Sequence, residues 1–153
     1  MAALANINLT FPLTFKIGFC IPVLVGAVSD GSGVIDGGGT VTLYLAFSAG
    51  AQGSWVKEAR IKLGSTTGII ASSATTMRFY LSTVNSGSPT TANSHPITEI
   101  GIPILTPQLN SATPDLIVPF NFAIPASSYI LCNIGVVQTT NAVWQVSIIG
   151  GDY

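Results

Sequence analysis

Residues 55–63 read WVKEARIKL, and this stretch shows the pattern that decides the fold. From Glu58 to Leu63, charged and apolar side chains alternate without interruption. Successive side chains of a β-strand point to opposite faces, so the stretch is predicted to be a strand with one buried and one solvated face. The buried face is expected to hold Ala59, Ile61 and Leu63, and the charged face Glu58, Arg60 and Lys62.

The same period of two recurs along most of the chain. In residues 40–47 the odd-numbered positions from Val41 to Phe47 are apolar and are expected on one face. Residues 97–105 are apolar but contain Gly101 and Pro103, which favours an edge or bulged strand. The other predicted strands are Thr40–Phe47, Met77–Val84, Ile97–Leu105, Leu116–Ile124, Tyr129–Val137 and Val143–Ile149, and the first 28 residues add one or two more, Ile7–Phe15 and Ile17–Val28.

Short strands separated by turns of Gly, Pro, Asn and Ser predict an all-β chain folded as an antiparallel β-sandwich. Helix signals are nearly absent. An immunoglobulin-like sandwich would require a Cys–Trp–Cys core, but Cys20 and Cys132, which bracket Trp55, are separated by 111 residues. The favoured fold is therefore a jelly roll of eight or nine strands.

The Gly-rich residues 29–39, SDGSGVIDGGG, mark a division within this single domain. We interpret residues 1–39 as an N-terminal arm or strand pair with a hinge, and residues 40–153 as the jelly-roll sandwich. The N-terminal stretch 1–15, MAALANINLTFPLTF, is apolar and strand-prone. Two interpretations stay open: an arm that adds to the sheet edge of a neighbour, or simply the first strand of the same sandwich.

The composition excludes several classes of protein. Only 11 of 153 residues are charged, the net charge is −1 and the mean hydropathy is +0.59. A coiled coil would need more Lys and Glu, disorder would need low hydrophobicity, and a nucleic-acid-binding protein would need a basic patch. No apolar stretch approaches the roughly 20 residues of a membrane-spanning helix. We therefore expect neither a nucleic acid nor a membrane as a partner.

The chain has few groups with which to do chemistry. Its single histidine, His95, lies in an expected loop, and no nucleophile-elbow pattern accompanies any serine. Glu58 beside Lys57 and Arg60 is expected to form a surface ion pair, and Glu99 to be a satisfied or partly buried acid on a strand. We predict no catalytic residue, no metal site and no cofactor, and hence no enzyme.

Cys20 and Cys132 both lie in apolar strand contexts, FCIP and LCN. Without a CxxC partner or further ligands, neither indicates a zinc site. They are interpreted as buried free thiols in a reducing compartment. A single disulfide that ties the N-terminal segment to the body is the alternative.

Ser, Thr, Asn and Gln together supply 43 residues, so the exterior is expected to be polar and neutral. A surface with so little charge does little to keep molecules apart. This favours a protein that works within an assembly. Aromatic residues near the arm and the chain end are candidate interface anchors, although core packing is the commoner fate of a Trp beside a strand. The candidate interface residues are Phe11, Phe15, Trp55 and Tyr153.

Five short motifs follow one another over residues 48–153. They are SAGAQGSWVKEARIKLGSTT (48–67), TMRFYLS (76–82), ITEIGIP (97–103), IPASSYILCN (124–133) and VSIIGGDY (146–153). Their order resembles a family of small tailed-phage virion proteins, whose pattern runs AGxxGSxIxxIRIK, RLFI, LPxGYxL and a terminal GGDY. The chain departs from that pattern at Ser54 and Trp55, where the family has GSR, and at Ser128, where it has Gly.

The resemblance implies a non-enzymatic virion structural protein of the jelly-roll capsid decoration, or cement, type. Such proteins sit as homotrimers on the capsid surface and stabilise the head by bridging subunits of the major capsid protein. The implied partners are thus the major capsid protein and the chain itself, and the implied location is the virion, assembled in the host cytoplasm. The alternative is a receptor- or glycan-binding module of a tail fibre or head spike, since jelly rolls often bind sugars.

Overall fold

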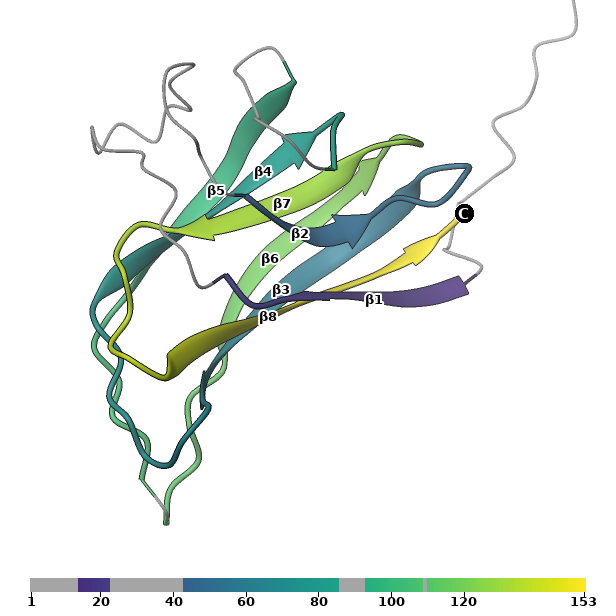
Figure 1. The fold of residues 1–153 in the computed structure, drawn as a ribbon. Helices are drawn as coiled ribbons and strands as arrows, with labels where there is room; N and C mark the ends of the chain where they lie inside the picture. Colours follow the sequence, from purple (N-terminus) through teal and green to yellow (C-terminus); the bar gives the residue numbers. More distant parts are fainter. Residues whose placement is uncertain (1–13, 23–42, 86–92, 109) are drawn as a thin grey trace, which may run out of the picture.

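The computed structural model describes residues 14–22, 43–85, 93–108 and 110–153, and within these ranges it contains eight strands and no helix (Figure 1). The described part accordingly contains no helix long and apolar enough to cross a membrane. The strands are β1 (Thr14–Cys20), β2 (Tyr44–Ser48), β3 (Ser54–Ser65), β4 (Thr75–Ser82), β5 (Ser94–Ile102), β6 (Leu116–Ile124), β7 (Tyr129–Ile134) and β8 (Ala142–Asp152).

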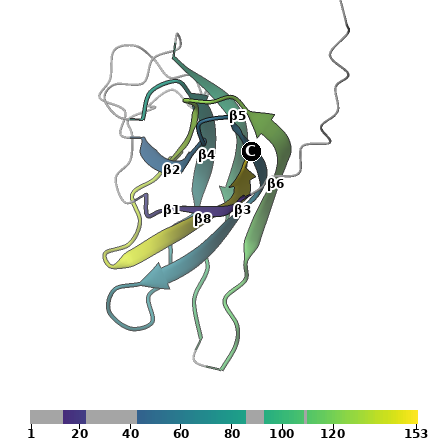
Figure 2. The same cartoon turned by 90° about the vertical axis from the view of Figure 1, so that its right-hand side faces the viewer.

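The strands form two four-stranded sheets that pack face to face. Sheet A has the order β1-β8-β3-β6 and sheet B the order β2-β7-β4-β5. Every neighbouring pair is antiparallel, and strands distant in the chain lie side by side, as β1 and β8 do. This is the strand order of an eight-stranded jelly roll, so the predicted fold class is confirmed. Figure 2 shows the two layers from the side, with the long β5–β6 loop extending beyond the sandwich.

The core between the sheets is built from the inward positions of the alternating strands. Trp144, Val146 and Ile148 of β8 are fully buried, whereas Gln145 between them is exposed. The predicted buried face of β3 is confirmed as well, because Ala59, Ile61 and Leu63 all belong to the core. A period of two is thus sufficient to place most core residues.

Three bulges shift the alternation. Val56 and Ala59 are three residues apart and both fully buried, because Lys57 is the extra residue of a bulge. Ala46 is the extra residue in β2, so Ala46 and Phe47 are both buried while Leu45 is 39% exposed. The expectation that Leu45 shares a face with Phe47 is therefore wrong.

The third bulge confirms a prediction. β5 is an edge strand of sheet B, and its register against β4 shifts at Ile97. The strand begins earlier than expected, so His95 lies on β5 and not in a loop. β7 is shorter than expected and ends at Ile134, before the exposed Val136 and Val137.

The N-terminal region is described only in part. The sequence predicts two strands here, one that ends at Phe15 and one that begins at Ile17. Thr14–Cys20 instead forms one continuous strand of sheet A. The described part of the N-terminal stretch thus belongs to the sandwich itself. Residues 1–13, which include Phe11, and the Gly-rich residues 29–39 lie outside the described residues, and the arm and hinge stay predictions.

At one edge of the sandwich, β1 of sheet A lies directly against β2 of sheet B. Gly18 faces inward at this point, and a Cβ there would overlap the carbonyl oxygen of Ala46 and lie 2.9 Å from the Cα of Phe47. Only a residue without a side chain lets two backbones approach this closely. Gly18 therefore allows β1 to lie against the bulge of β2.

We expect Gly18→Ala to lower the free energy of unfolding by at least about 2 kcal/mol, because the added methyl group must push β1 away from β2. Gly101→Ala is the matched control: it also lies in an edge strand, but a Cβ there would meet no atom within 4 Å. The control should stay within about 0.5 kcal/mol of the unchanged chain in urea denaturation. Equal losses in the two variants would contradict the role given to Gly18.

Candidate interaction surface

Three large apolar side chains line the outer face of β1. Phe15 is 70% exposed, and Ile17 and Phe19 are each 56% exposed. Their alternate partners Lys16, Gly18 and Cys20 point toward the inside of the sandwich, so the strand has its apolar side outward. We call Phe15, Ile17 and Phe19 the apolar stripe.

The strand register places more apolar groups beside the stripe. Phe15 lies opposite Gly151 of β8, and Gly151 in turn lies opposite Trp55 of β3. The backbones of Phe15 and Trp55 are thus two strand spacings apart, about 10 Å, with no side chain between them. One step along β8, Ile149 lies opposite Ile17. The stripe is therefore bordered by Ile149 on β8 and, across Gly151, by Trp55 on β3.

The opposite half of the same sheet face carries charges that are paired with one another. Glu58 accepts a hydrogen bond of 2.8 Å from Nε of Arg60 and lies 3.9 Å from Nζ of Lys57, which confirms the predicted ion pair. Lys62 pairs with Asp115 at 3.3 Å. These pairs neutralise the surface next to the stripe and leave the stripe itself uncharged.

Among the described strands β1 is also an edge strand, because it pairs with β8 alone. Natural proteins usually protect such an edge with charged side chains or proline, or cover it with another element. β1 has one charged residue, Lys16, and its outer face presents three exposed apolar side chains. An edge of this kind is a favourable site for contact with another chain.

A network of hydrogen bonds and an ion pair around Asp152 joins the start of β1 to the end of β8. Nζ of Lys16 donates to Asp152 at 3.0 Å and lies 5.4 Å from the centre of the Phe47 ring. The hydroxyl of Ser54 on β3 donates to the other oxygen of Asp152 at 2.5 Å. One carboxylate therefore holds β1, β8 and β3 together beside the apolar stripe.

The same contacts set the charge state of that carboxylate. Partial burial raises the pKa of Asp152, but the hydrogen bonds from Ser54, Lys16 and the Gly50 N–H, with the positive charge of Lys16, outweigh it and hold the pKa below its usual value. Asp152 is thus a stable anion at neutral pH. Next to it, the N–H of Tyr153 donates to the carbonyl of Gly53 at 3.2 Å, which holds the end of the chain against the β2–β3 loop.

The structure places three of the four predicted interface residues around this network. Phe15 and Trp55 share the outer face of sheet A, with Trp55 half-buried, and Tyr153 follows β8 directly. Phe11 lies outside the described residues. Sequence reasoning missed Ile17, Phe19 and Ile149, because alternating apolar residues are normally expected to point inward. One signal in the sequence indicated that the apolar side of this strand faces outward: Lys16 and Gly18, on the other side, are poor core residues.

The outer face of sheet B is different, since its centre is buried. Tyr80 and Asn133 are both fully buried there, and among the described residues neither the phenol oxygen nor the two amide atoms have a hydrogen-bond partner of good geometry. Burial raises the pKa of Tyr80, although the nearby Arg78 and Asn133 act in the opposite direction. Arg78 itself pairs with Glu99 at 3.2 Å. Glu99 is thus satisfied, as expected, but its side chain is 62% exposed and not partly buried.

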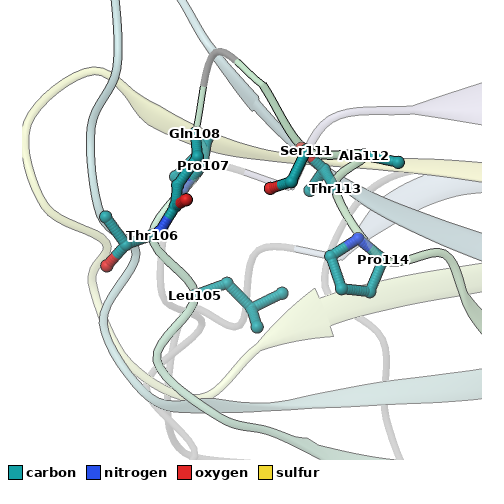
Figure 3. A pocket seen from close by; sticks show the side chains of 8 residues that line it. All are labelled: Leu105, Thr106, Pro107, Gln108, Ser111, Ala112, Thr113 and Pro114. Atoms are coloured by element: carbon teal, nitrogen blue, oxygen red, sulfur yellow. The ribbon is translucent and has the colours of Figure 1, made fainter.

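The described residues hold little that suggests catalysis. His95 is exposed on β5, and in residues 14–22, 43–85, 93–108 and 110–153 no three His, Cys, Asp or Glu side chains lie close enough to share a metal ion. A depression of about 240 Å³ lies in the β5–β6 loop (Figure 3). Leu105 and Pro114 lie at one end of it and Gln108 and Ser111 at the other, and none of its lining side chains is ionisable.

Comparison with known proteins identifies no relative: no protein-family model matches the chain, and neither a curated protein nor a solved structure matches it significantly.

Acid should weaken the fold partly through Asp152. Because its pKa is lower in the folded than in the unfolded chain, its stabilisation is complete above the unfolded pKa and is lost as the pH falls through the folded value. Asp152→Asn removes this contribution. Between pH 7 and pH 3 the urea midpoint of the unchanged chain should therefore fall more than that of the variant. Parallel pH profiles for the two proteins would show that Asp152 does not couple folding to protonation.

Proposed function

We propose that this chain is a capsid decoration protein, which forms a homotrimer and stabilises a phage head by bridging subunits of the major capsid protein. The observation that carries the proposal is the apolar stripe on β1, which is an edge strand among the described strands of sheet A. Phe15, Ile17 and Phe19 are too exposed to contribute much to the core of their own sandwich. Their place on a structural protein is explained if another chain covers them.

The size of the stripe fits such a role. With about 200 Å² for each side chain, the observed exposures leave on the order of 350 Å² of apolar surface in one strip. Covering that area stabilises a complex by on the order of 9 kcal/mol before the costs of association. A standard interface buries about 800 Å² on each partner, so Trp55, Ile149 and the strand edge would complete the contact.

The charges support contact through apolar groups. All five Lys and Arg side chains lie within 4.0 Å of a carboxylate of the same chain. Two neutralised surfaces of this kind do not repel each other, and an exposed apolar stripe on a free monomer would promote aggregation. We therefore assign the stripe to the contact between copies, and take the three-fold arrangement of those copies from the resemblance to decoration proteins. The trimer then binds the shell as a multivalent unit.

Physical roles can be given to residues of the motif VSIIGGDY, which is part of the resemblance to phage virion proteins. Gly150 packs against Phe47 and the carbonyl of Trp55, and a Cβ on it would lie 2.5 Å from that oxygen. Gly151 has no side chain, so the space between Phe15 and Trp55 stays open. Asp152 joins three strands through its carboxylate. Gly151 thus borders the proposed contact on the outer face, while Gly150 and Asp152 hold the strands together beneath it. This supports the proposal from physics, beside the resemblance of the motif.

The double variant Ile17→Ser/Phe19→Ser is expected to be a folded monomer, because it removes the contact but leaves the core intact. Sedimentation equilibrium should give three times the chain mass for the unchanged protein and the chain mass for the variant. The matched control is Ile104→Ser/Val137→Ser, whose side chains are 64% and 66% exposed elsewhere on the surface. It should stay trimeric. An unchanged chain that sediments as a monomer would contradict the proposed contact.

Binding to the shell is tested with heads purified without this protein. Adding the unchanged chain should raise the temperature at which the heads release DNA, and the monomeric variant should bind at least 100-fold more weakly, because it loses multivalent attachment. Heads with equal heat resistance with and without the protein would overturn the proposal. Specific, saturable binding to a glycan array, with no effect on heads, would instead support a receptor-binding module.

A further inference from the structure

The two cysteines of the chain meet between the two sheets. Cys20 ends β1 in sheet A, and Cys132 lies in the middle of β7 in sheet B. Their sulfur atoms are 3.1 Å apart and both are free thiols, joined by a hydrogen bond in the core. Residues that are 112 positions apart in the chain are thus brought into direct contact.

The step from this contact to a covalent bond is short. A disulfide has an S–S distance of about 2.05 Å, so the two sulfur atoms must approach by roughly 1 Å. Among the described strands β1 is hydrogen-bonded to β8 alone, and Cys20 is its last residue. The end of an edge strand moves more easily than a central strand, and side-chain rotation covers part of the distance.

We propose that Cys20 and Cys132 form a redox-controlled cross-link that ties sheet A to sheet B. In a reducing compartment the two residues stay thiols, and in the presence of a disulfide oxidant they are converted to a disulfide. This inference is independent of the proposed function, because it rests on the sulfur geometry alone.

The chemistry balances with oxidised glutathione as the oxidant. The Cys20 thiolate attacks one sulfur of glutathione disulfide, which forms a mixed disulfide and releases the first glutathione thiolate. The Cys132 thiolate then attacks the sulfur of Cys20 and releases the second one. The protein loses two protons and two electrons, and glutathione disulfide becomes two molecules of glutathione.

The order of attack follows from access. Cys20 is 8% exposed at the end of an edge strand, whereas Cys132 is completely buried. The hydrogen bond from Cys20 and, second, burial raise the pKa of Cys132, so its thiolate is scarce in the closed structure. Oxidation should therefore be slow in the native protein and faster when the end of β1 opens.

The cross-link would restrain the part of the fold that carries the apolar stripe. It closes a loop of 111 intervening residues, which contains β2, β3, β4, β5 and β6. By the loop-entropy relation and the usual size dependence of the melting temperature, a loop of this length raises the Tm by about 10 °C. It would also hold β1 against β2 when the sandwich opens locally.

The test uses the full, unmodified chain, incubated either with excess dithiothreitol or with glutathione disulfide. After oxidation we expect a mass loss of two hydrogens, a proteolytic peptide that joins the segments around Cys20 and Cys132, and a Tm about 10 °C higher than in dithiothreitol. Two alkylatable thiols that persist after oxidation overnight in about 2 M urea, which promotes local opening, would overturn the proposal. So would a disulfide that forms without any rise in Tm.

Serine variants separate the cross-link from other effects of the oxidant. Cys20→Ser and Cys132→Ser should each lose the redox dependence of Tm, and mixed disulfide with glutathione should accumulate only on the variant that keeps Cys20. If burial of a hydroxyl unfolds Cys132→Ser, then Cys132→Ala provides the same comparison. A variant with one cysteine that still gains the full shift in Tm would show that the stabilisation has another source.

Discussion

The approach of the β1 backbone to the β2 bulge is the constraint on which the rest of the structure depends. Gly18 lets β1 come this close, since a side chain there would occupy the position of the Ala46 carbonyl. The bulge at Ala46 brings Phe47 into the core at the same place, and Lys16 lies over the Phe47 ring. Once β1 is held there, its alternate side chains must face solvent, and Cys20 must face Cys132.

This constraint links the stability of the sandwich to its surface. The residues that point inward from β1 are a lysine, a glycine and a cysteine, which contribute little apolar burial. The strand is held instead by its ladder with β8, by the carboxylate of Asp152 and by close backbone packing. The apolar side chains of β1 therefore stay exposed on the outer face of sheet A. Under the proposed function a neighbouring copy covers them, which would also agree with the low charge of the whole protein.

Much of the fold could be predicted from the sequence, because a period of two is a local property. Leu116–Ile124 was predicted with the bounds that β6 has, and β5 was expected to be an edge or bulged strand. The bulge at Ala46 could not be predicted, since it depends on the register with β7. The stripe was only partly predicted: Phe15 and Trp55 were chosen as aromatics, but their common sheet face depends on β8 lying between them. Ile17 and Phe19 were missed because the usual rule puts apolar residues inside.

The proposed role is tested most directly by a reconstruction of the intact particle at a resolution that shows side chains. We expect three copies around a three-fold axis on the outside of the head, with Phe15, Ile17 and Phe19 of each copy buried against a neighbouring copy. A chain found on the tail, or a trimer on the head whose β1 strands face solvent, would contradict it.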